Sequence, residues 1–85
     1  MKIVSGMAVR YVDQVGAPHA ALLTEVHGEG ELPPTEGYPP PCVNLLYVSK
    51  DGSKRDSYGQ QIERETSVPH KSGQSAHGFF WELGD

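Results

Sequence analysis

The chain has 85 residues, of which 36% are hydrophobic and 21% are charged, and its formal net charge at pH 7 is −4. A chain this short forms one domain, residues 1–85, and buries only about 60–65% of the surface that its unfolded form exposes. The single cysteine, Cys42, excludes an internal disulfide and a four-cysteine zinc site.

The composition also predicts where the protein is made and what it does not bind. A lone cysteine suits a reducing compartment, and no apolar run follows the first residues that could serve as a signal peptide. No stretch approaches the about 20 apolar residues of a membrane span. The one basic cluster, residues 50–55, is interrupted by Asp51, whereas nucleic-acid binding requires several unopposed cations. We therefore expect a protein made in the cytoplasm, with no membrane and no nucleic-acid partner.

Two strands are predicted in the first third of the chain. Residues 7–12 alternate with a period of two and include β-branched and aromatic residues, which is typical of a strand. Gly16 and Pro18 then supply turn geometry. Residues 19–27 have a centre of helix-forming alanines and leucines, but their alternation and the glycines that follow favour a strand.

Residues 28–41 are rich in glycine and proline, and they end in three consecutive prolines. Proline cannot donate a ladder hydrogen bond, so this segment is predicted to be an extended surface loop or arm. Loops longer than about 12 residues are uncommon in small domains unless they bind something or are disordered. Two interpretations follow: a mobile insertion, or a contact arm whose pre-extended prolines reduce the entropy lost on docking.

The second half of the chain predicts three more strands. Residues 42–49 are apolar almost throughout, which suggests burial on both faces. Asp51-Gly52 then favours a hairpin turn, with a return strand over residues 56–66. After a loop, residues 77–82 form the last strand, in which Phe80 is expected to point outward, opposite Phe79 and Trp81.

Five short antiparallel strands suit a small closed barrel, because closure removes the unpaired edges of a thin sheet. The first two strands and their Gly-Pro turn are similar to the first hairpin of an SH3-like barrel. We therefore predict an all-β fold, a five-stranded antiparallel SH3-like barrel with one long Pro/Gly-rich loop.

Four segments together, residues 43–48, 56–65, 66–70 and 76–81, have a familiar sequence. The chain resembles small, mostly uncharacterised proteins encoded in tailed-bacteriophage genomes. The resemblance covers residues 6–82 and is most specific from Asn44 onward. It implies a phage-encoded accessory module associated with the virion, such as a capsid decoration, neck or tail component, and it carries no catalytic residues.

The histidines raise the alternative of a metal site. His19 and His27 share a face of one strand but would lie roughly 26 Å apart. His70 and His77 flank a loop and could converge, with Asp56 or Glu65 as a third ligand. No recognised ligand spacing is present, so we expect loop contacts for both histidines and no metal or other cofactor.

An enzyme is not predicted. Cys42 opens the most apolar strand and is expected to be a small core residue. The serines of the second half lie in turn contexts, where hydroxyl groups bond the local backbone. Glu63 and Glu65 share a strand face with Arg64 on the other, which is typical of cross-strand ion pairs.

An interaction module is the favoured function. The aromatic side chains of the second half exceed what one face of a thin barrel can cover, and aromatic residues and arginine dominate contact hot spots. The expected partners are copies of the protein itself or larger phage assembly proteins. The alternative is a small regulatory protein that binds a host enzyme in the cytosol. The candidate partner-binding residues are Tyr38, Tyr58, Arg64, Glu65, His70, His77 and Phe80.

Overall fold

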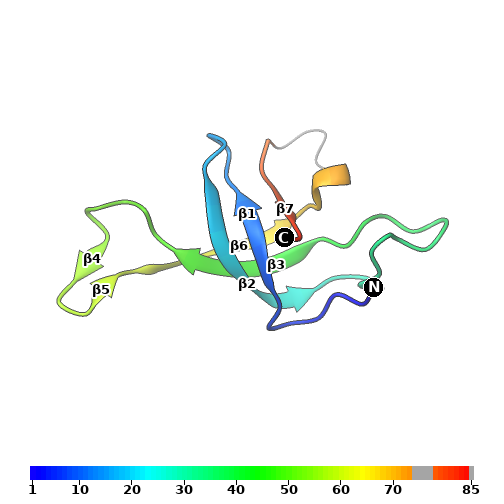
Figure 1. Cartoon of the computed structure of the whole chain (residues 1–85), viewed down its shortest axis with the longest axis horizontal. Coiled ribbons are helices and arrows are strands. Elements are labelled where there is room, and N and C mark those ends of the chain that lie inside the picture. The colour runs from blue at the N-terminus through cyan, green and yellow to red at the C-terminus, as the bar shows by residue number, and fades with distance from the viewer. Residues whose placement is uncertain (74–77, 85) are drawn as a thin grey trace.

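The computed structural model describes residues 1–73 and 78–84 and contains seven strands and one short helix in that part of the chain. Figure 1 shows a curled sheet in the centre, with an arm on one side and a loop on the other. The elements are β1 (Ala8–Val12), β2 (Pro18–Val26), β3 (Val43–Val48), β4 (Arg55–Asp56), β5 (Gly59–Gln60), β6 (Ile62–Val68), the 3₁₀ helix η1 (Lys71–Gly73) and β7 (Phe80–Glu82).

Five of the strands form one antiparallel sheet in the order β6-β3-β2-β1-β7, and β4 and β5 form a separate two-stranded ribbon. This confirms the predicted all-β fold and its five antiparallel strands. The sheet curls until its two ends meet at an isolated parallel bridge between His70 and Trp81, where the Trp81 N–H donates to the Pro69 carbonyl at 2.9 Å. The barrel is therefore closed at one point rather than by a continuous ladder.

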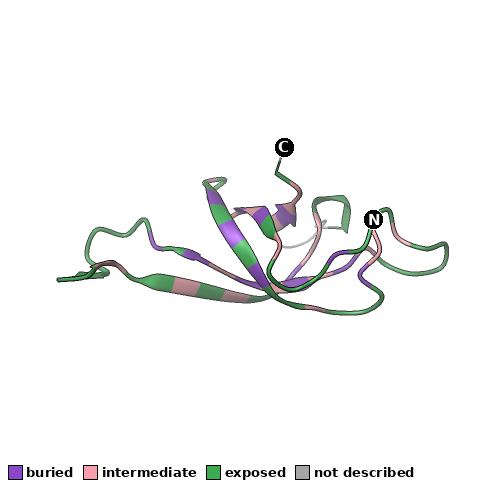
Figure 2. Cartoon of the chain, turned by 60° about the horizontal axis from the view of Figure 1, so that its bottom comes forward, coloured by how far each residue is buried: buried purple, intermediate pink, exposed green. Residues whose placement is uncertain are grey.

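The core follows from the period-two pattern of the strands. Successive side chains of a strand point to opposite faces, so every second residue lies inside the curl. Figure 2 shows this alternation as bands of buried and exposed residues along the strands. The buried hydrophobic residues are Ile3, Val9, Tyr11, Ala21, Leu23, Val43, Leu45, Tyr47, Val68 and Trp81.

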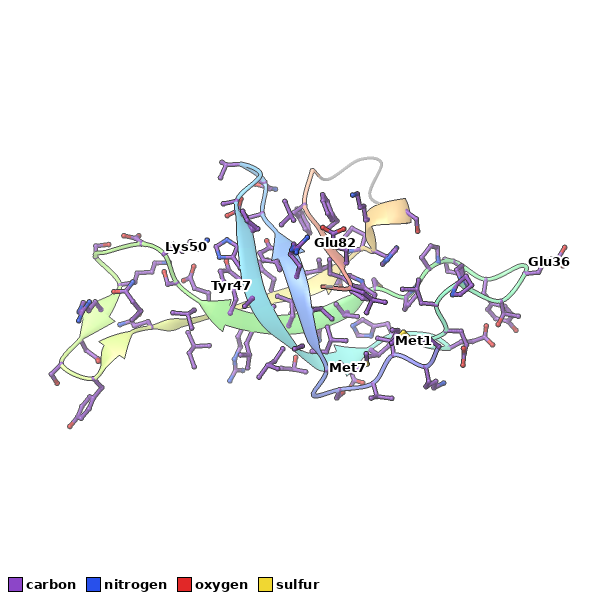
Figure 3. The ribbon with its side chains drawn as sticks, in the orientation of Figure 1. Met1, Met7, Glu36, Tyr47, Lys50 and Glu82 are labelled. Carbon is purple, nitrogen blue, oxygen red and sulfur yellow. The ribbon has the colours of Figure 1, made fainter. Side chains whose placement is uncertain are left out.

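Residues 28–41 protrude from the body, as the sequence predicts, but the base of the loop is held. The Ile3 N–H donates to the Gly30 carbonyl at 2.6 Å, and the Leu32 N–H donates to the Met1 carbonyl at 2.9 Å. Ile3 is fully buried by this pairing. Figure 3 shows Glu36 at the far tip of the loop, away from the sheet. The N-terminal segment thus ties the start of the loop to the core.

The predicted reversal at Asp51-Gly52 is wrong in its position. A turn is present there, since the Lys54 N–H donates to the Asp51 carbonyl at 3.0 Å, but the chain continues outward. It reverses one ribbon further on, between Asp56 and its partner Gly59. Local turn chemistry favoured Asp-Gly, whereas the register of β3 with β6 leaves the intervening residues to form the arm.

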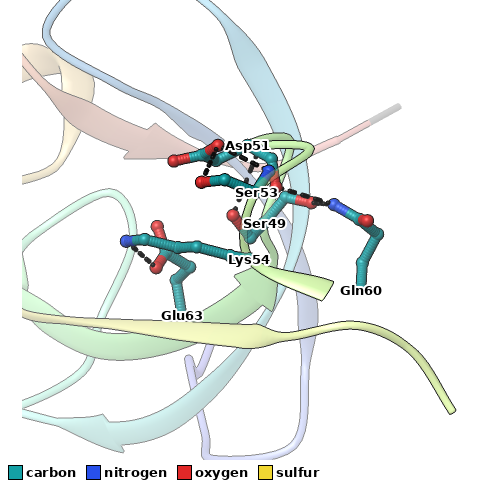
Figure 4. A network of polar contacts seen from close by, with 6 residues as sticks. All are labelled: Ser49, Asp51, Ser53, Lys54, Gln60 and Glu63. Carbon is teal, nitrogen blue, oxygen red and sulfur yellow. Dashed lines mark hydrogen bonds and ion pairs between the residues drawn. The ribbon is translucent and has the colours of Figure 1, made fainter. Parts of the chain in front are cut away.

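Polar contacts hold the base of this arm, residues 49–61, in place of a core (Figure 4). The Asp51 carboxylate accepts hydrogen bonds from the N–H and the hydroxyl of Ser53 at 2.9 and 2.7 Å. The Gln60 amide donates to the carbonyls of Ser49 and Asp51 at 2.9 and 3.1 Å. These bonds give the arm a defined shape, although its side chains are almost all exposed.

The prediction that β3 is buried on both faces is also wrong. Val43, Leu45 and Tyr47 are buried, but Val48 is 57% exposed on the opposite face. A single curled sheet has only one inner face, and no described element covers the outer one (Figure 1). The apolar outer residues of β3 therefore lie open.

Gly30 occupies a tightly packed position at the base of the loop, where a larger residue would not fit. Its φ of +72° disfavours any residue with a Cβ, and a Cβ there would lie 2.9 Å from the Ile3 carbonyl oxygen. We expect Gly30→Ala to lower the free energy of unfolding by roughly 2–5 kcal/mol, since backbone strain and overpacking add. Urea unfolding followed by Trp81 fluorescence measures this change.

The matched control is Gly37→Ala, because Gly37 has a similar φ of +89° with nothing near its Cβ position. Gly37→Ala should lower the free energy of unfolding by backbone strain alone, roughly 1–2 kcal/mol. Equal losses in the two variants would show that the Ile3–Gly30 contact does not tie the loop to the core.

Candidate functional site

The predicted partner-binding residues do not form one site. Tyr38 lies in the loop of residues 28–41 and is 57% exposed, whereas Tyr58 lies at the tip of the arm and is 97% exposed. Loop and arm extend in opposite directions from the sheet (Figure 1). The molecule is 48 Å long and only 25 Å wide, so these two rings cannot touch the same small partner surface.

His70 and Phe80 lie together at the closure of the barrel. The His70 ring packs edge-on against Trp81, with 4.8 Å between ring centroids, and its Nδ1 lies 2.9 Å from the Ser72 hydroxyl. Burial lowers the pKa of His70. Phe80 lies on the face opposite the buried Trp81, as expected, but it is half-buried, with the Lys71 ammonium 5.8 Å from its ring centroid. These residues secure the end of the sheet.

The structure does not bring the candidate metal ligands together. Asp56 lies on β4 in the arm, away from His70, and His77 lies outside the described residues. His27 is exposed and lies 3.0 Å from the Asn44 side-chain oxygen, while His19 is buried in the sheet. Within residues 1–73 and 78–84, no group of three or more His, Cys, Asp or Glu residues is placed to hold a metal ion.

Most of the aromatic rings that the sequence placed at a contact surface are inside. Tyr47 and Trp81 are buried and Phe79 and Phe80 are half-buried, which leaves Tyr58 as the exposed ring of that group. Cys42, expected in the core, is half-buried. On the strands of the main sheet the exposed large apolar side chains are aliphatic, namely Leu22, Val48 and Ile62.

Arg64 and Glu65 are neighbours in sequence that serve two different surfaces. Arg64 pairs with Leu46 of β3 and is exposed on the outer face, whereas Glu65 pairs with Leu45 and lies half-buried on the inner face. The sheet thus presents two candidate sites, one on each side of β6.

The first site is the outer apolar face, which we define as Ala8, Ala20, Leu22, Leu46, Val48 and Ile62. Cross-strand pairing builds it: Ala8 pairs with Leu22, Leu22 with Leu46, and Val48 with Ile62. Leu22, Val48 and Ile62 are 45%, 57% and 62% exposed. A shallow hollow of about 220 Å³ lies between these side chains.

Arginines border the outer apolar face on two sides. Arg64 continues the ladder at the β6 edge and makes no ion pair with any residue of the described part of the chain. Arg10 lies across from Ala20 and reaches Glu82 of β7 at 3.4 Å. Arg10 is thus compensated by Glu82, which lies on the same face, whereas Arg64 supplies a positive charge at the β6 edge.

The second site is a pocket of about 290 Å³ on the inner side of the curl, which we call the tyrosine pocket. β1, β3 and β6 supply its walls, and the turn after β1 supplies its rim. It is lined by Tyr11, Asp13, Gln14, Val15, Tyr47, Glu65 and Phe79. Figure 3 shows Tyr47 within the body of the sheet, beside β2.

Two tyrosine rings, those of Tyr11 and Tyr47, line the tyrosine pocket, and the His19 ring packs against both of them. The centroids of Tyr11 and Tyr47 lie 5.0 Å apart, and the His19 ring lies 5.7 Å from Tyr11 and 4.5 Å from Tyr47. The His19 Nε2 bonds the Asp13 carboxylate at 2.8 Å, while its buried Nδ1 has no hydrogen-bond partner among the described residues. Such an orphaned polar atom in a core costs free energy unless another feature requires it.

The pocket has a negative electrostatic potential. Burial raises the pKa of Tyr11 above its usual range, and the charges of Glu65, Tyr47 and Asp13 raise it further. Burial also raises the pKa of Tyr47, with added contributions from Glu63, Glu65 and Asp13. Both phenols therefore stay neutral over the physiological pH range.

Sequence reasoning selected Glu65 but missed Tyr11, Asp13 and His19 as members of a site. Period two placed Tyr11 on the inner face with Val9, yet nothing local indicated that Glu65 would lie near it. The arm between β3 and β6 sets that register. The sequence did contain one signal for this part of the site. Asp13 and His19 lie on either side of a tight turn, which places a carboxylate and an imidazole close enough to pair.

Comparisons with known proteins leave the site to be judged on its geometry. No protein-family model, no curated protein and no solved structure matches the chain. The described residues include no helix with the length and apolar character that crossing a membrane would take.

The Asp13–His19 pair predicts an acid-dependent stability. Asp13 accepts hydrogen bonds from His19 and from the Ala17 N–H, and the bond from His19 is the largest cause of its lowered pKa. Because the folded chain binds the proton at Asp13 less readily than the unfolded chain, this stabilisation is complete above the ordinary aspartate pKa of about 4 and is lost as pH falls. Asp13→Asn should flatten the rise in unfolding free energy between about pH 2 and pH 5.

Urea unfolding at several pH values measures this dependence. At pH 7 we expect Asp13→Asn to cost roughly 1–2 kcal/mol, since a charge-assisted bond becomes a neutral one. Glu36→Gln is the matched control, because Glu36 is exposed at the loop tip. If Asp13→Asn retained the unaltered pH profile, the Asp13–His19 bond could not be its source.

Proposed function

We propose that this protein is a non-enzymatic structural module that associates with copies of itself through the outer apolar face. The observation that carries the proposal is the open face itself. It is continuous across β1, β2, β3 and β6, and it presents leucine, valine and isoleucine side chains where a monomeric sheet would present polar ones. A second protein surface would remove these side chains from water.

The thin core supports the same function. A chain of 85 residues in a single curled sheet buries little apolar surface, so covering one more face adds a large fraction of its stability. Burial of apolar surface contributes about 25 cal/mol per Å². Subunit contacts would thus supply stability that the isolated fold lacks.

The position of β6 favours a second copy as the occupant. β6 is the edge strand next to the outer apolar face, and its outer side pairs with no other strand of the described residues. Antiparallel pairing of one edge strand with its own copy is two-fold symmetric, which suits the closed symmetry that most homo-oligomers have.

The place of this assembly is proposed from the sequence resemblance. The likeness to small proteins of tailed bacteriophages supports a virion accessory role, as a capsid decoration, neck or tail component. The elongated shape, with the arm and the loop of residues 28–41 at opposite ends, supports docking onto neighbours on both sides. Tyr58 and Tyr38 would then make the peripheral contacts.

Self-association is tested by size-exclusion chromatography with light scattering. We expect a mass of twice the 9.3 kDa chain mass for the unaltered protein. Ile62→Lys places a charge in the outer apolar face beside Arg64, so it should weaken the dimer at least about tenfold. Val48→Lys should have the same effect from the neighbouring position on β3.

The matched control is Val4→Lys, because Val4 is 48% exposed but lies before β1 and outside this face. It should leave the dimer unchanged. A monomer at all concentrations, or equal weakening by Val4→Lys, would contradict association through the outer apolar face. Mass spectrometry of purified particles of the encoding phage tests the virion role, and binding to a host enzyme without a place in the particle would favour the regulatory alternative.

A further inference from the structure

We propose that the tyrosine pocket binds a guanidinium group, presented by an arginine side chain of another chain or by a small free molecule. This site lies on the inner side of the curl, so it is separate from the outer apolar face and does not depend on the proposed self-association. Its residues come from β1, the β1–β2 turn, β3, β6 and the approach to β7.

The first argument is that one carboxylate of the pocket, that of Glu65, has no hydrogen-bond donor or cation beside it among the described residues. Glu65 is half-buried, yet its carboxylate makes no ion pair or hydrogen bond with any residue that the structure describes. Glu63 lies two residues away on the same face and is neutralised by the Lys54 ammonium at 2.7 Å. A half-buried carboxylate without a partner is costly, and a cation in the pocket would remove that cost.

The second argument concerns the two phenols. Tyr11 and Tyr47 are 3% and 8% exposed, and both line the pocket. Neither hydroxyl group makes a hydrogen bond to a residue in the described ranges 1–73 and 78–84. The rings are buried, but neither hydroxyl oxygen is sealed in the core, because the one fully buried orphaned polar atom of the described residues is the His19 Nδ1. Both oxygens are therefore available to a ligand with several N–H groups.

The third argument is the sign of the charge. Asp13 and Glu65 line the pocket, and no lysine or arginine does. The carboxylates also add to the raised pKa values of Tyr11 and Tyr47, although burial is the largest cause of both shifts. An anionic ligand would be repelled, and a neutral one would leave the Glu65 carboxylate without compensation, whereas Asp13 already accepts hydrogen bonds from His19 and Ala17.

The choice of guanidinium over ammonium follows from the number and layout of the acceptors. A guanidinium group carries five N–H donors in one plane, stacks on aromatic rings and is more weakly hydrated than an ammonium group. It can bond a carboxylate with two parallel bonds while its remaining donors reach phenol oxygens. An ammonium group has three donors and loses more hydration on entering a half-buried pocket.

The test is a titration of the full chain, followed by ¹⁵N–¹H correlation spectra, with N-acetyl-arginine methylamide and with agmatine. We expect saturable shifts at the residues lining the pocket, with dissociation constants of about 1 mM or lower for one of the two probes. Equal affinities would support recognition of the guanidinium group itself. A clear preference for N-acetyl-arginine methylamide would favour a protein arginine as the ligand, and a clear preference for agmatine would favour a small free one. N-acetyl-citrulline methylamide, which has the same shape without the charge, should bind at least about tenfold more weakly.

The matched variants are Glu65→Gln and Glu63→Gln, two isosteric changes on the same face of β6. Glu65→Gln should weaken binding at least about tenfold, because it removes the unpaired charge, whereas Glu63→Gln should leave it within about twofold. Circular dichroism confirms that each variant is folded. Tyr47→Phe should also weaken binding of the guanidinium probe, because it removes one phenol oxygen from the pocket. Absence of saturable shifts up to about 10 mM, equal binding of the citrulline probe, or equal loss in both glutamate variants would overturn the proposal.

Discussion

One buried tryptophan holds the ends of this sheet together. Trp81 is fully buried, and its indole N–H donates to the Pro41 carbonyl at 2.9 Å while its backbone N–H donates to Pro69. Residue 41 precedes β3, residue 69 follows β6, and Trp81 itself lies on β7. A curled sheet with one bridge at its closure depends on this contact, because no second layer presses the two edges together.

The same architecture explains why the outer apolar face is open. A sheet closed on itself has an inner and an outer face. The residues outside the sheet form an arm and a loop that extend outward (Figure 1). Neither segment folds back over β2 and β3. Covering Leu22, Val48 and Ile62 therefore falls to another molecule, and the edge strand β6 lies beside them.

The inner face combines two roles that oppose one another. Tyr11, His19 and Tyr47 pack as part of the core, but the carboxylates of Asp13 and Glu65 bring charge to its margin. Stability alone would favour aliphatic residues there, since a half-buried carboxylate needs a partner. The polarity of this end of the core is the kind of local conflict that accompanies binding sites.

Local pattern was sufficient for much of the fold. The five main strands, the outward loop of residues 28–41 and the inward alternation of Val9 and Tyr11 were all predictable, because the pleat of a strand fixes which side chains share a face. The resemblance to phage proteins and the non-enzymatic function stay predictions. Phe80 was expected outside and is half-buried, because η1 places Lys71 over its ring.

The sequence by itself determined that the strands form and, for β1, which side chains share a face, since both depend on neighbours along the chain. Only the tertiary structure decided which residues meet across strands: that Glu65 lies by Tyr47 and Asp13, and that Arg64 borders an uncovered aliphatic face. The reason is that cross-strand register depends on the length and path of the connections. A turn signal at Asp51-Gly52 could not reveal that the chain would extend into an arm before returning as β6.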